Sequence, residues 1–259
     1  MSNTNALIGH TGFVGSNLLA QQDFGATFNS SNIASIRGQS FSHVICAGVT
    51  AVKWWANKNA EEDRARIQAL MGDLASITAE RFTLISTIDV YGSPIDVRES
   101  DQPALEGLHP YGLNRVMLED FIAGRFAVHH ILRLPGLFGD GLKKNAIYDM
   151  MHGNMLDVIN PASSFQWYPL GRLSADIAAA GTQGLRVLNL ATEPVATGTI
   201  QARFFPGVEI GGKAGATAQY RMLSEHAALF GGRDGFIMDQ AAVLDAMGAF
   251  IARAQGQAQ

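Results

Sequence analysis

Several features that would place this chain outside the cell or in a membrane are missing from its sequence. It has one cysteine among 259 residues, Cys46, which excludes an internal disulfide and fits a reducing compartment. No apolar stretch is long enough to span a bilayer, and the first residues lack the basic and apolar blocks of a signal peptide. The formal net charge of −4 gives no basic footprint for nucleic acid. We therefore expect a cytoplasmic protein that binds neither nucleic acid nor a membrane.

The seven histidines show no spacing that is typical of a metal site. His129 and His130 are neighbours in a predicted strand, so their side chains point to opposite faces and cannot chelate one ion together. His10 lies in a glycine-rich loop, where we expect it to make a local hydrogen bond. Cys46 lies in the apolar run 43–47, which predicts a buried and unreactive thiol. We predict no metal site.

Short apolar runs alternate with helical patterns through the first half of the chain. In the segment 59–78 the apolar residues recur every three or four positions, which is typical of a helix with one buried face. Strands and helices that alternate with short connections predict an α/β fold of the Rossmann type, a doubly wound parallel sheet covered on both faces. The predicted strands are 5–9, 25–29, 42–47, 81–87 and 127–134, and the predicted helices are 12–21, 59–78 and 111–125.

The pattern becomes looser after about residue 135. We divide the chain into a sheet domain, residues 1–140, and a mixed region, residues 141–259, which completes the sheet and forms a small C-terminal substrate lobe. In this second region we predict helices at 142–152, 173–180 and 236–254, an extended segment at 163–170, a strand at 186–190 and a frayed tail at 255–259.

The first sixteen residues combine an apolar run, a glycine-rich turn and the start of a helix. The glycines of the turn stand three apart, and a helix N-terminus offers unpaired N–H groups and a partial positive charge. Glycine also lets the backbone approach a pyrophosphate closely. We interpret this loop as a dinucleotide site, with a tight turn that binds nothing as the alternative. The candidate binding residues are Gly9, Thr11, Gly12, Phe13, Val14 and Gly15.

A second group of polar residues lies at the end of the predicted strand 81–87 and on the helix 111–125. Tyr111 and Arg115 stand four apart on this helix, so both side chains project from one face. A cation beside a phenol favours the phenolate, which makes Tyr111 a candidate acid or base for a carbonyl or an alcohol. Thr87 can hold the same substrate oxygen while a dinucleotide transfers hydride. We predict Thr87, Tyr111 and Arg115 as the catalytic residues.

Together these segments resemble the extended short-chain dehydrogenase/reductases, and in particular their NAD-dependent epimerase/dehydratase branch, which acts largely on nucleotide sugars. The glycine loop, the strand end Ser-Thr-x-x-Val-Tyr-Gly (86–92), the Tyr-x-x-x-Arg pair and the segment 133–139 carry this resemblance, which covers roughly residues 5 to 140. It implies that Tyr111 is the acid/base and Thr87 its hydroxyl partner. Arg115 stands where the branch has a lysine that bonds the nicotinamide ribose. The resemblance also implies cofactor contacts from Ala47, Gly48 and Pro135.

The sequence departs from this branch in the residues that would meet the substrate. Ile88 replaces one of the two acids of the 4,6-dehydratases, which argues against dehydration. Asp89 is either a substrate contact or a turn residue at the strand end. The Arg-Asp pair that contacts the nucleotide diphosphate in relatives is absent from 165–172, a segment that can also be an aromatic core segment. The candidate substrate residues are Thr50, Asp89, Asn145, Gln166, Tyr168 and Arg172.

The segment 28–32 bears on the choice between NAD and NADP. NAD binders of this fold usually place a carboxylate about 20 residues after the loop, and none is present here. Asn29 and Ser30 are the candidate cofactor contacts, and Arg37 can approach a 2′-phosphate. We therefore favour NADP slightly over NAD, although a polar loop alone would also explain the segment.

These features predict an NAD(P)-dependent reductase or epimerase that acts on a carbonyl or secondary alcohol of a nucleotide sugar, with the reductase slightly favoured. A non-catalytic dinucleotide sensor or scaffold is the alternative, because related folds host both kinds of protein. The resemblance also implies a homodimer that forms through the helices 59–78 and 111–125. The apolar stripe of the helix 59–78 fits such an interface, and it equally fits burial against the chain's own sheet.

Overall fold

The computed structural model describes residues 4–256, and within this range the chain divides into two compact units. The first unit contains the chain up to Ser93, Glu99–Leu134 and Gly171–Asn189. The second unit contains Pro94–Arg98, Pro135–Leu170 and the chain from Leu190 onward. The chain enters the second unit at Pro135, a few residues before the predicted boundary at 140. The later segment Gly171–Asn189 belongs to the first unit again.

The first unit is built on a six-stranded sheet in which all neighbouring strands are parallel. The strand order is β2-β1-β3-β4-β5-β9, so the chain reverses direction across the sheet between β1 and β3. The predicted doubly wound parallel sheet is confirmed. Its strands are β1 (Asn5–Ile8), β2 (Ala26–Phe28), β3 (Ser40–Cys46), β4 (Thr78–Thr87), β5 (His129–Leu134) and β9 (Val187–Asn189).

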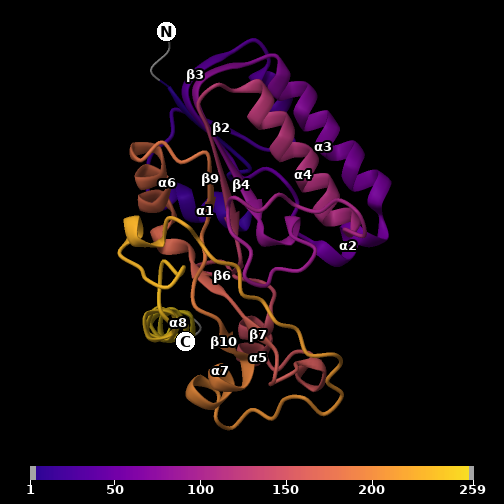
Figure 1. Cartoon of the computed structure of the whole chain (residues 1–259), viewed down its shortest axis with the longest axis vertical. Coiled ribbons are helices and arrows are strands. Elements are labelled where there is room, and N and C mark those ends of the chain that lie inside the picture. Colours follow the sequence, from indigo (N-terminus) through magenta and orange to yellow (C-terminus); the bar gives the residue numbers. More distant parts are fainter. Residues whose placement is uncertain (1–3, 257–259) are drawn as a thin grey trace. The chain divides into compact units, whose positions relative to one another are not determined.

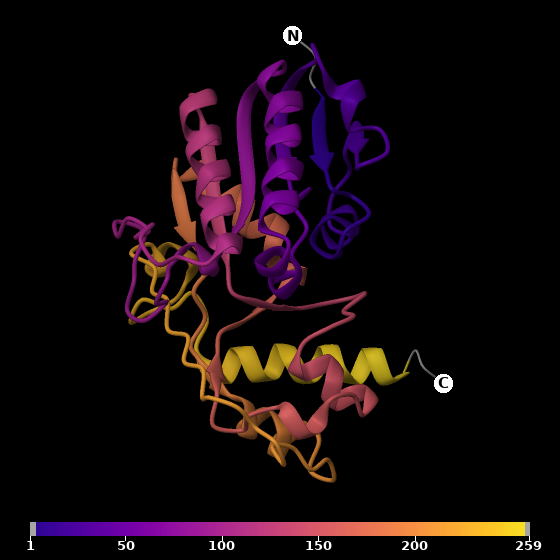
Figure 2. The same cartoon turned by 90° about the vertical axis from the view of Figure 1, so that its right-hand side faces the viewer.

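Helices cover both faces of this sheet (Figure 1). On one face α3 and α4 lie side by side, which both views show (Figures 1 and 2), and α1 and α6 lie on the other. Ile67 and Leu74 of α3 are buried in the core that forms against the sheet. The helices of the unit are α1 (Phe13–Leu19), α2 (Lys53–Lys58), α3 (Ala60–Ala75), α4 (Pro110–Arg125) and α6 (Leu173–Thr182), with short 3-10 turns η1 (Ile33–Ile36), η2 (Ile88–Val90) and η4 (Leu170–Arg172) at or beside them.

Two helices of the first unit are shorter than predicted. The helix predicted to reach residue 78 ends at Ala75, because Thr78 already pairs with Ser40 in the sheet. The helix predicted at 12–21 is shorter at both ends. The buried Cys46 is confirmed, and burial raises the pKa of its thiol to about 11, so the thiol stays protonated and unreactive.

The second unit has its own apolar core, which helices and two small sheets share. Residues 163–170 were predicted to be extended, and they form two short strands on either side of Gln166. The strand β6 pairs with β8 in parallel and β7 pairs with β10 antiparallel. The elements are β6 (Gly136–Phe138), α5 (Ala146–His152), η3 (Leu156–Val158), β7 (Ser164–Phe165), β8 (Trp167–Pro169), β10 (Val195–Ala196), α7 (Thr197–Phe204), η5 (Ala227–Phe230) and α8 (Gln240–Gly256).

The closing helix begins four residues later than predicted. The residues before it bond elsewhere: the Ile237 N–H donates to the Ala191 carbonyl at 2.8 Å. The Glu193 carboxylate then accepts the Gln240 N–H at 2.6 Å, which satisfies a donor at the start of α8. The predicted frayed tail is wrong at residues 255 and 256, where α8 continues, and its last three residues lie outside the described range. Among the described helices, none combines the length and the apolar composition that a membrane span requires.

Candidate functional site

A cavity of about 630 Å³ lies in the first unit, at the carboxyl ends of β1 and β3. This is the topological switch point, at which open parallel sheets bind ligands. The cavity is lined by the loops that follow β1, β2 and β3 and by one face of α3. Its lining residues are Ile8, Gly9, Thr11, Gly12, Asn29, Ser30, Ile33, Ala47, Gly48, Val49, Thr50, Asp63, Arg66, Ile67, Ala69, Leu70 and Asp73.

The glycines of the first loop are required by backbone geometry. Gly9 has a φ of +86° and its N–H donates to the Phe28 carbonyl at 2.7 Å. A Cβ at Gly9 would overlap the backbone of Ala47, and a Cβ at Gly15 would overlap the carbonyl of Gly9. Gly12 caps the N-terminus of α1. The result is a close-packed turn of backbone at a helix start, which fits a pyrophosphate.

The structure places the predicted cofactor residues at different distances from this cavity. Those that line it are Gly9, Thr11, Gly12, Asn29, Ser30, Ala47 and Gly48. Phe13, Val14 and Gly15 form the first turn of α1, where N–H groups have no partner within the helix, and they are not among the lining residues. Pro135 belongs to the second unit. Thr50, predicted to contact substrate, lines the same cavity as the glycine loop. His10 makes its expected local hydrogen bond, with Nδ1 3.0 Å from the Phe28 carbonyl.

The loop after β2 presents amides and hydroxyls to the cavity. The Asn29 side chain accepts from the N–H and the hydroxyl of Ser31, and Asn32 accepts the Asn29 N–H at 2.7 Å. Arg37 pairs with Asp73, whose carboxylate oxygen is 2.6 Å from Nε, and 63% of the arginine side chain remains exposed. The Asp73 carboxylate, which lines the cavity, is thus bound to a cation.

Thr87 and Tyr111 meet beside the sheet and form a hydrogen bond between their side chains. Thr87 is the last residue of β4, and Tyr111 is in the first turn of α4. The tyrosine is buried, and this burial raises the pKa of its phenol above the ordinary value, whereas the charge of Arg115 and the bond from Thr87 act in the opposite direction. The phenol is therefore protonated at neutral pH.

Arg115 connects this pair to the cavity. Its guanidinium lies over the Tyr111 ring, with Cζ 3.8 Å from the ring centroid. It forms an ion pair with the buried Asp63 of α3 and donates to the Thr50 carbonyl at 2.6 Å. Asn114 also donates to Asp63, at 2.8 Å. Thr50 and Asp63 both line the cavity. The Arg115 side chain therefore contacts the cavity wall on one side and the Tyr111 ring on the other.

Close packing fixes the start of α4 against the end of β4. His109 caps the helix, since its Nδ1 accepts the Gly112 N–H at 2.9 Å. Asn57 of α2 accepts the Tyr111 N–H at 2.9 Å. Gly112 lies so near η2 that a Cβ there would be 2.5 Å from the Asp89 carbonyl. The backbone of α4 is therefore in close contact with that of η2 at this point.

Asp89 lies beside the phenol and is paired with a lysine. Its carboxylate is 2.7 Å from Nζ of Lys53, the first residue of α2. Its N–H donates to the Thr87 hydroxyl at 3.1 Å, so it also fills the turn role that the sequence left open. Both charges act on the phenol of Tyr111, in opposite senses.

The structure gives the remaining predicted substrate residues roles within the protein. The Asn145 side chain caps α5, where it accepts from the N–H groups of Ile147 and Tyr148. Gln166 is buried and its amide bonds the backbone of Thr192 and Met222. Tyr168 is fully buried, as the aromatic core alternative predicts, and Arg172 pairs with Asp176 at 2.7 Å. We do not include Gln166 and Tyr168 in the site, because their side chains are enclosed.

The segment 133–139 contributes a buried polar network. Arg133 pairs with Glu119 of α4 at 2.6 Å and donates to the Tyr91 hydroxyl at 2.6 Å. Glu119 also accepts the hydroxyl of Ser86. This network joins β4, β5 and α4 in the interior, where partial removal would leave charges uncompensated.

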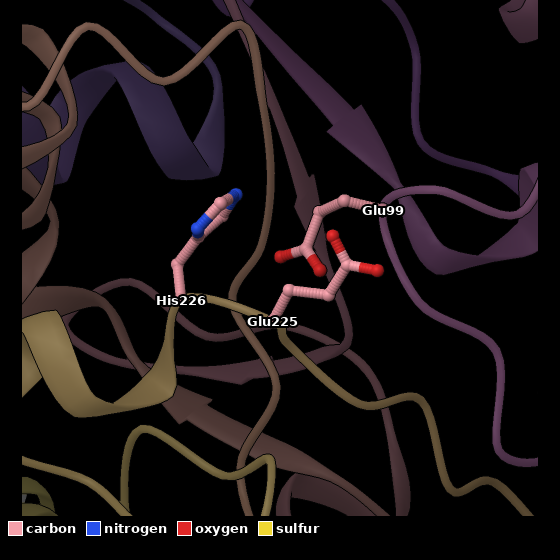
Figure 3. Close-up of side chains that lie close together, drawn as sticks. All are labelled: Glu99, Glu225 and His226. Atoms are coloured by element: carbon pink, nitrogen blue, oxygen red, sulfur yellow. The ribbon is translucent and has the colours of Figure 1, made fainter.

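Figure 3 shows the side chains of two acids and a histidine, Glu99, Glu225 and His226. Glu99 belongs to the first unit, where it accepts the Asn189 N–H at 2.8 Å. Glu225 and His226 belong to the second. We assign no metal site to them.

No family model matches the chain, and no curated protein matches its sequence. Solved structures match over nearly its whole length. MoeE5 in complex with UDP-glucose and NAD is 16% identical, with 99% of this chain and 100% of that one covered and a TM-score of 0.68. UDP-glucose 4-epimerase from Thermotoga maritima, with UDP-glucose, is 13% identical, with 98% and 100% covered and a TM-score of 0.71. The dTDP-4-dehydrorhamnose reductase from Bacillus anthracis, in complex with NADP, is 12% identical, with 98% and 99% covered and a TM-score of 0.73.

The chain has their Rossmann-type fold. The fold that the sequence resemblance implied is thereby confirmed. At these identities the likeness concerns the fold, and the chemistry has to be argued from the residues of this chain.

Two residues of the site, Asp63 and Lys53, were missed by the sequence analysis. Asp63 lies in the first turn of α3, where acidic residues commonly face the helix dipole, so nothing distinguished it from Glu61 and Glu62. Lys53 lies on a helix that the sequence pattern did not reveal. The burial of Asp63 against α4 becomes visible only once the two helices are packed together.

Proposed function

We propose that this protein is an NAD(P)-dependent reductase that acts on a carbonyl group of a nucleotide sugar. The observation that carries the proposal is the bonded pair of Thr87 and Tyr111, which a single arginine connects to the cavity wall beside the glycine loop. The solved structures of this fold include UDP-glucose and dTDP-sugar enzymes, which supports the choice of substrate class.

The residues of the cavity fit a dinucleotide. Gly9 and Gly12 would hold the pyrophosphate, and Ala47, Gly48 and Thr50 would contact the rest of the molecule. When bound, the cofactor supplies the hydride. Thr87 holds the substrate oxygen by a hydrogen bond, and Tyr111 gives its phenolic proton to that oxygen as negative charge develops there.

The protonation state of the phenol favours reduction as the forward direction. Reduction of a carbonyl needs a proton donor, whereas oxidation of an alcohol, the first step of an epimerase, needs a phenolate. Burial raises the pKa of Tyr111, and each cation near it is paired with an acid, Arg115 with Asp63 and Lys53 with Asp89. This arrangement supports the reductase over the epimerase.

The proposal is tested by mixing the protein with NADPH and 4-keto sugar nucleotides and following absorbance at 340 nm. We expect turnover that falls at least about 100-fold in Tyr111→Phe, since a positioned acid contributes on the order of 10²–10⁴-fold. NADPH binding, measured by fluorescence titration, should be unchanged in this variant.

Two results would contradict the proposal. Unchanged absorbance together with interconversion of the corresponding alcohols would identify an epimerase. Tight cofactor binding without turnover of any sugar nucleotide would favour the non-catalytic alternative.

We also propose NADP as the preferred cofactor. Asn29 and Ser30 offer no carboxylate to repel a 2′-phosphate, and the exposed guanidinium of Arg37 lies at the Asp73 end of the cavity. The dissociation constants of NADPH and NADH decide this point, and a lower constant for NADH would contradict it.

A homodimer is proposed from the family resemblance, with α3 and α4 at its interface. The large apolar residues Ile67 and Leu74 of α3 are buried within the chain, so the interface would use the outer face of these helices. A monomeric mass by light scattering at micromolar concentration would contradict the dimer.

A further inference from the structure

The ion pair between Lys53 and Asp89 transfers neither hydride nor proton in the proposed reaction. Lys53 begins α2 and Asp89 lies on η2, and their side chains are 37% and 17% exposed. Solvent, and hence a ligand, can reach the pair. A partly exposed pair of this kind adds only modestly to stability, so stability alone does not explain its position.

The pair lies next to the catalytic phenol. Asp89 follows Thr87 by two residues and its N–H donates to the Thr87 hydroxyl. Lys53 and Asp89 both influence Tyr111, and both influence His109, which caps the same helix. The pair therefore stands beside the atoms that hold the substrate oxygen.

The charges around the phenol are balanced within the described residues. Arg115 on α4 is paired with Asp63 on α3, and Lys53 on α2 with Asp89 on η2. Burial and the charge of Lys53 lower the pKa of His109, which keeps that imidazole neutral at neutral pH. A ligand at this place meets one ammonium and one carboxylate side by side, with no net charge.

Such a pair recognises neutral hydroxyl groups. A carboxylate accepts a hydrogen bond from a hydroxyl, an ammonium donates one, and bonds to charged groups are the stronger kind. A carboxylate on the ligand would lie against the carboxylate of Asp89, and the two negative charges would repel each other. A polyhydroxy sugar therefore fits the pair, and a uronic acid does not.

We propose that Lys53 is a substrate-binding residue that, with Asp89, holds the hydroxyl groups of the sugar beside the reacting carbon and selects neutral sugars over uronic acids. The inference rests on the proposed function, since it assigns a subsite to the same nucleotide-sugar substrate. It goes beyond that function because it makes the pair the determinant of sugar choice.

The test measures binding by calorimetry, with NADPH present, for the wild type and for Lys53→Met and Asp89→Asn. The probes are UDP-glucose and UDP-glucuronic acid, with UDP alone as the reference for the nucleotide, and the dTDP series is used if it binds better. Lys58→Met is the matched control, because Lys58 is an exposed lysine at the other end of the same helix.

We expect Lys53→Met to weaken UDP-glucose binding by about 10-fold and to leave UDP binding unchanged, which corresponds to the loss of one charged hydrogen bond. Asp89→Asn leaves the ammonium without its carboxylate, so the preference should shift toward UDP-glucuronic acid by about 10-fold. Structural damage would not produce this reversal. Lys58→Met should behave as the wild type.

Each remaining outcome is decisive. If the wild type binds UDP-glucose more tightly than UDP and neither variant alters the sugar contribution or the preference, the role of the pair is overturned while the proposed function stands. If the wild type binds neither series, the proposed function fails and the inference with it. Should Lys53→Met not fold, the preference of Asp89→Asn decides alone.

Discussion

The buried ion pair of Arg115 and Asp63 is the residue-scale feature with the largest expected effect on stability. Both side chains are about 95% buried or more, and each is the other's charge partner. Removing one partner leaves the other charge buried and uncompensated, which typically costs about 3–5 kcal/mol. We expect Arg115→Met to lower the free energy of unfolding by about 3 kcal/mol, as measured by urea denaturation.

The double variant Arg115→Met with Asp63→Asn provides the control for this prediction. It removes both charges, so it should recover at least half of the stability that Arg115→Met loses. A loss below about 1 kcal/mol in the single variant would show that water reaches Asp63 and that the pair is not desolvated.

His43 on β3 gives the protein a pH dependence of stability at the residue scale. Burial, with smaller contributions from Arg81 and His130, lowers the pKa of His43 to about 4, and its Nε2 is 2.8 Å from the Thr83 hydroxyl. The unfolded chain therefore binds this proton at a higher pH than the folded chain does. The contribution of neutral His43 to the free energy of unfolding is fully present above about pH 6.5. It is lost as the pH falls toward 4, by at most about 1.4 kcal/mol per pH unit.

The measurement compares urea unfolding of the wild type and His43→Gln at pH 7, 6 and 5. The wild type should lose stability faster than the variant, by roughly 1 kcal/mol per pH unit, because the imidazole keeps some contact with solvent. Parallel curves would mean that His43 titrates normally in the folded state.

At the scale of single residues, the sequence predicted the pair of Thr87 and Tyr111 because both stand in motifs of fixed spacing. It did not reveal what surrounds them. The partner of Arg115 lies 52 positions earlier on another helix, and that of Asp89 lies 36 positions earlier. Charge pairing over such separations depends on how the elements pack, which local patterns do not encode.

At the scale of elements, the start of α4, which carries Tyr111, packs closely against η2. A Cβ at Gly112 would lie 2.5 Å from the Asp89 carbonyl and 2.9 Å from a methyl group of Leu108. Gly112→Ala must therefore move the first turn of α4 away from the end of β4. We expect a loss of about 1–3 kcal/mol in stability and a fall of at least about 10-fold in kcat/KM.

Gly124 lies on the same helix and offers the matched control. A Cβ there meets nothing within 4 Å, so Gly124→Ala should gain about 0.5–1 kcal/mol from helix propensity and keep full activity. If Gly112→Ala were as active and as stable as Gly124→Ala, the close contact between Gly112 and the Asp89 carbonyl would not determine the position of Tyr111.

The elements of the sheet were predictable, whereas the two short helices α2 and α7 were not. Each strand of the sheet carries an apolar run, because a parallel sheet covered on both faces buries both sides of its strands. In contrast, α2 buries only Ala56, and α7 buries only Thr197 and Ile200, so neither shows a helical stripe. Lys53 was missed for this reason.

At the scale of the whole molecule, each unit has a separate apolar core, and the cavity belongs to one of them. The core of the first unit lies against the six-stranded sheet, and that of the second is shared by α5, α7 and α8. The chain passes between the units several times, which no composition shift in the sequence marked. The predicted division at residue 140 placed all later residues in one mixed region that completes the sheet and forms the lobe.

Because every residue that lines the cavity belongs to the first unit, cofactor binding should protect that unit first. A ligand that binds only the folded state reduces local opening at its contacts. In hydrogen exchange followed by mass spectrometry, we expect NADPH to slow exchange in peptides that cover residues 9–12, 29–33 and 47–50. Peptides from α7 and α8 should change little. Tyr111→Phe should show the same protection, since the phenol is not among the cavity's lining residues, and unchanged exchange in all three segments at saturating NADPH would place the cofactor elsewhere.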